Sequence, residues 1–161
     1  MSTLIVSGFP GVGKTTLAER EPFVLDSDSS KFSWLTEGIR NPDFPDNYLY
    51  HIKNSLRYYS AFTKQEVEPY NLILVSSHQT VRNALVEHGL DFTLVYPARE
   101  IKTEYIQRYI DRGNQDSFVA LLEKEWDSWM DGLEDDKDCK HIRLQSGEYL
   151  SDKIKISWKK N

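Results

Sequence analysis

A glycine-rich stretch, residues 8–15, joins an apolar β-branched run at residues 3–7 to a segment of helical pattern at residues 15–20. It reads Gly-Phe-Pro-Gly-Val-Gly-Lys-Thr and meets the pattern G-x-x-x-x-G-K-[ST] in full, between a strand and a helix. Glycines let successive backbone N–H groups turn inward to form an anion site, to which the following helix adds its positive N-terminal end. The sequence therefore predicts a phosphate-binding loop; the alternative is a turn that binds nothing.

The loop residues have separate expected roles. Lys14 should reach the β- and γ-phosphates of a bound nucleotide, and the Thr15 hydroxyl should hold Mg²⁺. The residues expected to surround the phosphates are Gly8, Pro10, Gly11, Val12, Gly13, Lys14, Thr15 and Thr16. ATP and Mg²⁺ are therefore the expected cofactors.

The rest of the chain alternates between strand and helix patterns. Further strands are expected at residues 23–25, 71–76, 92–96 and 141–144, and helices at 48–62, 81–88, 100–111 and 116–130. Residues 29–46 are expected to form a loop and a short helix, and residues 133–140 an acidic turn. The alternation predicts an α/β fold with a parallel sheet covered by helices, whose ligands bind beyond the carboxyl ends of the strands. Because no repeat or linker interrupts it, residues 1–161 are expected to form one domain.

The composition argues against several classes of protein. The chain has one cysteine, so it can form neither an intramolecular disulfide nor a multi-cysteine zinc site, which fits a reducing compartment. No apolar run approaches the ~20 residues of a membrane span. No export signal precedes the first strand, so a cytoplasmic protein without a membrane partner is expected. The net charge of −5 argues against broad binding to a nucleic-acid backbone, although a local basic cleft is compatible with it.

Two carboxylates follow the second expected strand, in the sequence Asp26-Ser27-Asp28. Residues two apart on a strand share a face, so both carboxylates can point toward the crevice beside the loop. A carboxylate there can accept the proton of an attacking hydroxyl or hold the water shell of a metal. Asp26 and Asp28 are thus candidate substrate contacts, and Asp26 a water-mediated metal ligand. The alternative is a solvated turn in which Ser29 or Ser30 caps a helix.

Three arginines are candidate phosphate contacts. Arg108 and Arg112 are four residues apart, so they share one face of a helix and can neutralise charge on a transferring phosphoryl group. Arg108 can instead pair with Glu104, one turn earlier on that face. Arg40 can clamp an acceptor phosphate, or it can be a solvated loop residue.

The third expected strand ends in Ser76-Ser77-His78. Many proteins with a loop of this kind place an aspartate there to hold the magnesium shell. Serine can still bond to a metal-bound water. His78 can face the acceptor, or it can be an ordinary polar residue at the end of a strand.

Two aromatic pairs invite comparison with base-stacking sites: Tyr58 with Tyr59, and Trp126 with Trp129. Each pair lies within an expected helix, and the tryptophans are three residues apart. Packing in the core is therefore the expected role of both pairs.

These motifs, in this order from residue 3 to about residue 114, resemble the P-loop kinases of the nucleotide-kinase and polynucleotide-kinase type. The sequence is also similar to small kinases encoded by bacteriophages. Residues 103–113, Thr-Glu-Tyr-Ile-Gln-Arg-Tyr-Ile-Asp-Arg-Gly, are similar to the lid-helix pattern T-E-h-h-x-R-x-x-x-R-G of phage polynucleotide 5′-hydroxyl kinases.

The resemblance implies a three-layer P-loop kinase fold with a short helical lid at about residues 104–117. It implies that Asp28 lies near the general base, and that Arg108 and Arg112 lie near the lid arginines. The sequence departs from the pattern at Ser77, where polynucleotide kinases carry an aspartate. It also lacks the D-G-F-P-R signature of adenylate kinases.

The sequence supports three functions. The first is an ATP-dependent kinase acting on a small nucleotide, a (deoxy)nucleoside monophosphate, which the short chain, the acidic charge and the arginines favour. The second is a kinase of a hydroxyl group in DNA, at a 5′ end or on a hydroxymethylated pyrimidine base. The lid pattern favours this acceptor, and the lack of a long basic stripe counts against it. The third is a switch or interaction module that hydrolyses ATP slowly, against which the arginine pair argues. A phage-encoded protein of this kind is expected in the host cytoplasm.

Overall fold

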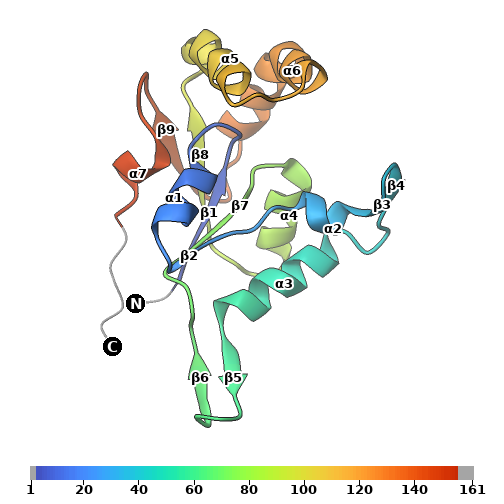
Figure 1. Cartoon of the computed structure of the whole chain (residues 1–161), viewed down its shortest axis with the longest axis vertical. Coiled ribbons are helices and arrows are strands. Elements are labelled where there is room, and N and C mark those ends of the chain that lie inside the picture. The colour runs from blue at the N-terminus through green and yellow to red at the C-terminus, as the bar shows by residue number, and fades with distance from the viewer. Residues whose placement is uncertain (1–2, 156–161) are drawn as a thin grey trace.

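Five parallel strands form the central sheet of the computed structural model, which describes residues 3–155 (Figure 1). The strands are β1 (Leu4–Gly8), β2 (Val24–Asp26), β7 (Leu72–Ser76), β8 (Thr93–Pro97) and β9 (Lys140–Leu144). Their order across the sheet is β2-β7-β1-β8-β9, and every pairing is parallel. The predicted α/β fold with a parallel sheet is confirmed.

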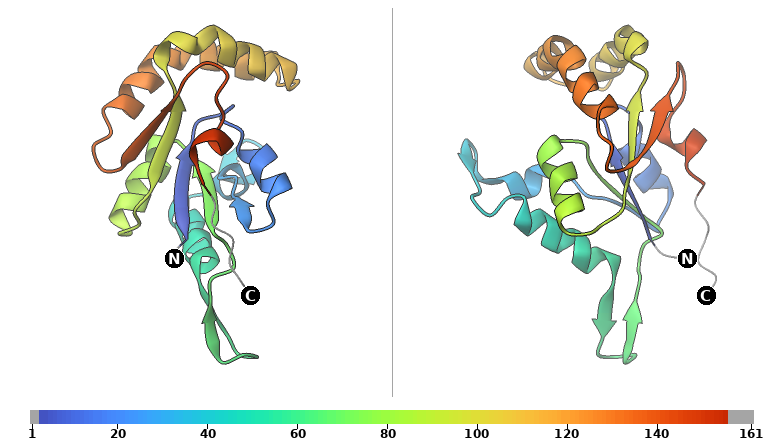
Figure 2. Two further views of the ribbon diagram at one scale, coloured as in Figure 1. Left: turned by 90° about the vertical axis from the view of Figure 1, so that its left-hand side faces the viewer. Right: turned by 180° about the vertical axis from the view of Figure 1, so that it is seen from behind.

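Helices flank this sheet. The longer ones are α1 (Lys14–Arg20), α3 (Asp46–Leu56), α4 (Gln79–Glu87), α5 (Lys102–Asp111) and α6 (Asp116–Glu134). Shorter turns are α2 (Ser30–Ser33), η1 (Arg99–Ile101) and α7 (Leu150–Lys153). Helices α1 and α4 lie on opposite sides of the sheet (Figure 2), while α5 and α6 lie together near the end where β1 and β8 finish (Figure 1). Within residues 3–155, every helix is too short or too polar to span a bilayer.

The core forms around strands that are apolar along their whole length. In β7 the residues from Leu72 to Val75 are at most 1% exposed, because the strand is covered on both faces and has no solvent side. Trp126 on α6 is fully buried and packs edge-on against Phe9, with ring centroids 5.7 Å apart. Trp129 is partly buried against the same core. The predicted core role of the two tryptophans is confirmed.

The helix predicted at residues 48–62 is wrong in its second half. Helix α3 ends at Leu56, and the chain then forms an antiparallel hairpin of β5 (Tyr58–Ser60) and β6 (Gln65–Val67), which projects from the body of the molecule (Figure 1). Aromatic residues favour strands, and Lys64 closes the turn with a φ of +56°. Tyr58 and Tyr59 are 49% and 65% exposed, so their predicted core role is also wrong.

A second hairpin lies within residues 29–46, where the sequence predicts only a loop and a short helix. Helix α2 is the short helix, and it leads into β3 (Trp34–Thr36) and β4 (Ile39–Arg40). Trp34 lies opposite Arg40 across the two strands, and Gly38 occupies the turn with a φ of +77°. The N–H of Asn41 donates to the carbonyl of Ser33 at 2.8 Å, which closes the base of the hairpin.

Candidate functional site

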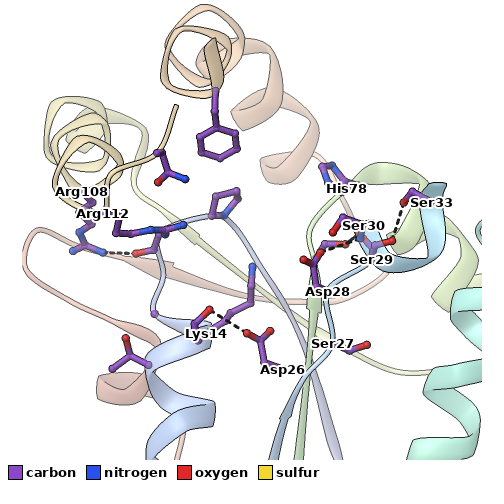
Figure 3. Close-up of a pocket in the computed structure, with 18 of the residues that line it drawn as sticks. Lys14, Asp26, Ser27, Asp28, Ser29, Ser30, Ser33, His78, Arg108 and Arg112 are labelled. Atoms are coloured by element: carbon purple, nitrogen blue, oxygen red, sulfur yellow. Dashed lines mark hydrogen bonds between the residues drawn. The ribbon is translucent and has the colours of Figure 1, made fainter. Parts of the chain in front are cut away.

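A cleft of about 1300 Å³ lies at the carboxyl ends of the strands (Figure 3). It brings together predicted site residues from separate segments of the chain, namely Lys14, Thr15, Asp26, Asp28, Arg40, His78, Arg108 and Arg112. Pro10, Gly11, Gly13 and Thr16 of the glycine-rich loop line it as well. Gly8 and Val12 lie behind the surface, where the Val12 side chain is fully buried in the core.

The glycine-rich loop, residues 8–15, makes a tight connection between β1 and α1. Gly11 and Gly13 have φ angles of +92° and +99°, a region in which side chains other than hydrogen are strained. A Cβ on Gly11 would lie 3.0 Å from Cε1 of Tyr109, and a Cβ on Gly13 would lie 3.1 Å from Cδ1 of Tyr149. Tyr109 also donates its hydroxyl to the carbonyl of Pro10 at 2.8 Å. Two tyrosine rings therefore pack directly on the loop and fix its path.

Lys14, the first residue of α1, is partly buried beside the loop. Its Nζ donates to the carbonyl of Gly8. Burial lowers the pKa of Lys14 to about 8; the Asp26 carboxylate opposes this shift and the Arg112 guanidinium adds to it. An anion bound next to Nζ would stabilise the charged form that burial disfavours, so this lysine suits the binding of a phosphate.

Thr15 and Asp26 lie together below Lys14. The Thr15 hydroxyl donates to Oδ2 of Asp26 at 3.1 Å, which links the start of α1 to the end of β2. Both groups are oxygen ligands of the kind that Mg²⁺ accepts, and Mg²⁺ in nucleotide sites is commonly held by one or two protein oxygens together with phosphates and waters. Residues 3–155 contain no cluster of three or more His, Cys, Asp or Glu suited to a metal ion. Thr15 and Asp26 are therefore two oxygen groups that could contribute to a magnesium site completed by other ligands.

Asp28 lies across the cleft from Arg108 and Arg112 (Figure 3). Its Oδ1 accepts the N–H of Ser30 at 2.9 Å, so Asp28, and not Ser29 or Ser30, supplies the side chain that caps α2. The segment is anchored from below by the Tyr48 hydroxyl, which donates to the carbonyl of Ser27 at 2.7 Å. The carboxylate combines both roles that the sequence left open: it caps a helix, and it lines the cleft.

Arg108 is held by the protein on all sides. One guanidinium nitrogen, Nη1, donates to the carbonyl of Gly11 at 2.8 Å, and Nη2 donates to Glu104 at 3.0 Å and to the carbonyl of Glu148 at 3.1 Å. The guanidinium also lies between two rings, 4.3 Å from the centroid of Tyr105 and 4.0 Å from that of Tyr149. The pairing with Glu104, which the sequence offered as the alternative to a phosphate contact, is present, and it occurs together with a contact to the loop that the sequence did not predict.

Arg112 has a different environment. It is exposed, and within residues 3–155 no hydrogen bond or ion pair joins its guanidinium to another side chain. Its guanidinium carbon lies 5.9 Å from the centroid of the Tyr109 ring. Arg112 is thus a guanidinium in the cleft wall whose donors are available.

The segment between β9 and α7 belongs to the site, although the sequence gives no motif for it. The N–H of Leu150 donates to the carbonyl of Val12 at 2.8 Å, and Glu104 accepts from the Ser146 hydroxyl at 2.6 Å and from the N–H of Gly147 at 3.1 Å. Tyr149 itself lines the cleft. These contacts join residues about 40 or more positions apart in the chain, which local patterns do not reveal.

His78 and Arg40 line the cleft on the side of Asp28. Burial lowers the pKa of His78, and the positive charges of Lys14 and Arg40 lower it further, so the imidazole is neutral at neutral pH. Arg40 lies over the indole of Trp34, 4.1 Å from the ring centroid. Ser76, the last residue of β7, lines the cleft, while the carbonyl of the following Ser77 accepts from Nε of Arg82 at 2.9 Å.

Two polar atoms in the cleft wall are buried without a hydrogen-bond partner among the described residues, Oγ of Ser27 and Oδ1 of Asn114. An unpaired buried polar atom costs about 1–3 kcal/mol. Such atoms are expected where a bound molecule or water completes the hydrogen bonding, so they are consistent with a ligand site here.

A scan of the chain against protein-family models finds no match, and a search of curated proteins finds no relative. The resemblance to P-loop kinases therefore stays a prediction, which rests on the sequence motifs and the geometry of the cleft.

Proposed function

We propose that this protein is an ATP-dependent kinase with a P-loop kinase fold, which transfers the γ-phosphate of ATP to a nucleotide-type acceptor. The observation that carries the proposal is the convergence of Lys14, the Thr15–Asp26 pair, Asp28 and Arg112 on one cleft. These residues come from separate segments of the chain, and together they offer two cations, an oxygen pair able to hold a metal ion, and a base. That combination suits phosphoryl transfer, in which positioning and charge stabilisation do most of the work.

The donor nucleotide would bind at the glycine-rich loop. Backbone N–H groups of the loop and the Lys14 ammonium would bind the β- and γ-phosphates, and Thr15 with Asp26 would hold Mg²⁺, which offsets the negative charge of the phosphates. Arg112, whose donors are available, would contact the transferred phosphoryl group. Three of the five N–H donors of Arg108 already bind protein acceptors, one of them the carbonyl of Gly11, so we assign this residue to positioning the loop against α5.

The acceptor side of the cleft favours a hydroxyl group as the acceptor. Among the described residues that line the cleft away from the loop and α5, Arg40 is the one cation, and the serines of residues 27–33 surround Asp28. A monophosphate would bring its negative charge next to Asp26 and Asp28 with Arg40 alone to offset it. A neutral hydroxyl can instead donate to Asp28. The monophosphate, which the acidic net charge and short chain favour, is the second candidate.

In the transfer, a bond forms between the acceptor oxygen and the γ-phosphorus. The bond from that phosphorus to the β–γ bridging oxygen breaks, ADP leaves, and the proton of the acceptor hydroxyl passes to Asp28. The rigid anchoring of Asp28 through Ser30 and the Ser27 carbonyl keeps its carboxylate in place during this step.

We place the closing part of the lid at residues 110–117. Tyr105 and Tyr109 are fully buried, so the earlier part of α5 cannot swing without exposing two aromatic rings. Residues 110–117 are mostly exposed, and Gly113 has a φ of +77° that suits a hinge. Their movement would carry Arg112 and Asn114 toward the phosphates.

The test is a transfer screen with γ-labelled ATP and magnesium against nucleosides, nucleoside monophosphates and 5′-hydroxyl single-stranded DNA. Label should appear on a hydroxyl-bearing acceptor with the wild type. Lys14→Ala should abolish transfer while the protein stays folded, and Lys53→Ala, an exposed lysine on α3, should leave it unchanged. Full turnover in folded Lys14→Ala would refute the proposal, and so would a wild type that neither binds ATP nor transfers label.

A further inference from the structure

A tryptophan and an arginine form a stacked pair at the edge of the cleft, on the β3–β4 hairpin. Trp34 and Arg40 are cross-strand neighbours, and the guanidinium carbon of Arg40 lies 4.1 Å from the centre of the indole. Both residues line the cleft, yet Trp34 is 41% exposed and Arg40 is exposed too. A large aromatic residue is thus kept out of the core and placed in a polar cleft wall.

The base of the hairpin is fixed to the body of the protein. Phe32 on α2 packs on Tyr48 and His51 of α3, with ring centroids 5.3 and 4.9 Å apart, and its carbonyl accepts from Nδ2 of Asn47 at 2.9 Å. The hydrogen bond from Asn41 to Ser33 closes the hairpin directly above this anchor. Because α2 is also the helix that Asp28 caps, Trp34 and Asp28 are held at a set separation by one short, rigid segment.

The position of Trp34 differs from that of the other apolar residues on the hairpin. Leu35 and Ile39 are 61% and 57% exposed, but neither lines the cleft, whereas Trp34 and Arg40 do. Being exposed on this hairpin is therefore not enough to place a side chain in the cleft wall. What distinguishes it is that an aromatic plane, a cation and the Asp28 carboxylate border the same space.

We propose that the Trp34–Arg40 pair binds the unpaired base of the acceptor. This inference rests on the proposed kinase function and names its substrate class: a nucleoside or single-stranded nucleic acid that presents a free hydroxyl. The base stacks on the planar pair, an adjacent phosphate lies against Arg40, and the hydroxyl reaches Asp28. Stacking on exposed aromatic and guanidinium groups is a sequence-tolerant way to hold single-stranded nucleic acid, since every base has a flat face.

The experiment measures acceptor binding without ATP by titration calorimetry, a readout that does not depend on Trp34 itself. The ligands are a short oligothymidylate with a 5′-hydroxyl, an abasic oligomer of the same length, and thymidine. Trp34→Ala should weaken oligothymidylate binding about tenfold or more, and Trp34→Phe should restore most of the affinity. Leu35→Ala, a neighbouring exposed apolar residue outside the cleft, should bind as the wild type does. The abasic oligomer should bind weakly and with no dependence on Trp34.

Thymidine binding distinguishes a nucleoside acceptor from a nucleic-acid acceptor. Thymidine binding that depends on Trp34 as strongly as oligothymidylate binding identifies a nucleoside acceptor, and Trp34-dependent binding of the oligomer alone identifies nucleic acid. Equal oligothymidylate affinity in the wild type and in folded Trp34→Ala would overturn the inference. ATP binding, measured separately on the wild type and Lys14→Ala, tests the kinase proposal on its own, so the two failures are distinguishable.

Discussion

The partly buried ammonium of Lys14 should make the proposed binding of ATP depend on pH. The pKa of Lys14 is lowered from 10.5 to about 8, and a bound phosphate would raise it again. Below pH 8 the site is charged and ready for the anion. Above pH 8 the free protein must take up a proton to bind, so we expect ATP affinity to fall by up to about tenfold per pH unit. Titration calorimetry at a series of pH values measures this.

The lowered pKa of Lys14 should make the free energy of unfolding rise with pH, whereas it makes the expected ATP affinity fall. Between pH 8 and 10.5 the unfolded chain holds a proton on Lys14 that the folded protein has released, so the free energy of unfolding should rise with pH in this window. Lys14→Met removes both trends and is the control. A wild-type ATP affinity that does not change with pH would show that Lys14 does not contact the phosphates.

Asp28→Asn tests the base at the scale of a single atom pair. Asparagine keeps an oxygen that can accept the N–H of Ser30, so α2 and the melting temperature should be preserved. With a hydroxyl acceptor, turnover should fall on the order of 10²-fold or more, because the proton has no acceptor. ATP affinity should not change. A variant that loses ATP affinity and keeps its maximal rate would assign Asp28 to the metal instead of the proton.

At the scale of elements, the two arginines of the α5 region should separate into a structural and a catalytic role. Arg108→Ala removes the donor to the Gly11 and Glu148 carbonyls and one of the partners of the Glu104 carboxylate, so the free energy of unfolding should fall by about 1–3 kcal/mol. Arg112→Ala, at an exposed residue without such partners, should change it by no more than about 0.5 kcal/mol and still lower turnover. Chemical denaturation and single-turnover kinetics measure both effects.

The prediction for Arg108 and Arg112 would be contradicted if their effects on stability and turnover were exchanged. A stable Arg108→Ala with impaired phosphoryl transfer, beside a fully active Arg112→Ala, would show that Arg108 leaves its carbonyl contacts to act on the phosphate. Arg108→Lys sharpens the test, since lysine keeps the charge but cannot make the forked contacts between Tyr105 and Tyr149.

Periodicity predicted the main helices and strands and failed where an element ends for non-periodic reasons. Leu49 and Ile52 have helical spacing and are fully buried on α3. Tyr59 continues that spacing and is 65% exposed, because the helix has already ended at Leu56. The β3–β4 and β5–β6 strands are two or three residues long, which is too short for an alternating pattern to be recognised.

In the site too, residues that are close together in the sequence could be predicted, and contacts between distant segments could not. The glycine-rich loop is contiguous, so its residues could be predicted from the sequence alone. Asp28 could be placed near it because parallel strands end at one edge of a sheet. The contacts of Glu148 and Tyr149 with Arg108 could not, since they depend on how the chain turns after β9. The place of Trp34 in the cleft wall could not be predicted either, because it depends on the hairpin that sets this residue opposite Arg40.

At the scale of the whole molecule, nucleotide binding should protect some regions and not others. Saturation with ATP and magnesium at about a hundred times the dissociation constant should stabilise the fold by about 2.7 kcal/mol. Hydrogen exchange should slow in residues 8–15, which include the loop that lines the cleft, and in residues 110–117, the proposed lid. It should stay unchanged in the β5–β6 hairpin, which projects from the body of the molecule (Figure 1). Protection absent from residues 110–117 would argue against closure of that segment.

The order of strands in the sheet determines when each strand can find its partners as the chain leaves the ribosome. Strand β1 precedes both of its hydrogen-bonding neighbours in the chain, since β7 and β8 begin at Leu72 and Thr93, and β2 also pairs with β7. On the ribosome, the apolar residues of β1 therefore have no sheet partner until much of the chain has emerged. The glycine-rich loop takes its final shape later still, when Tyr109 and Tyr149 arrive to pack on it. The proposed phosphate-binding loop is thus complete only after residue 149 has been made, long after the loop itself has left the ribosome.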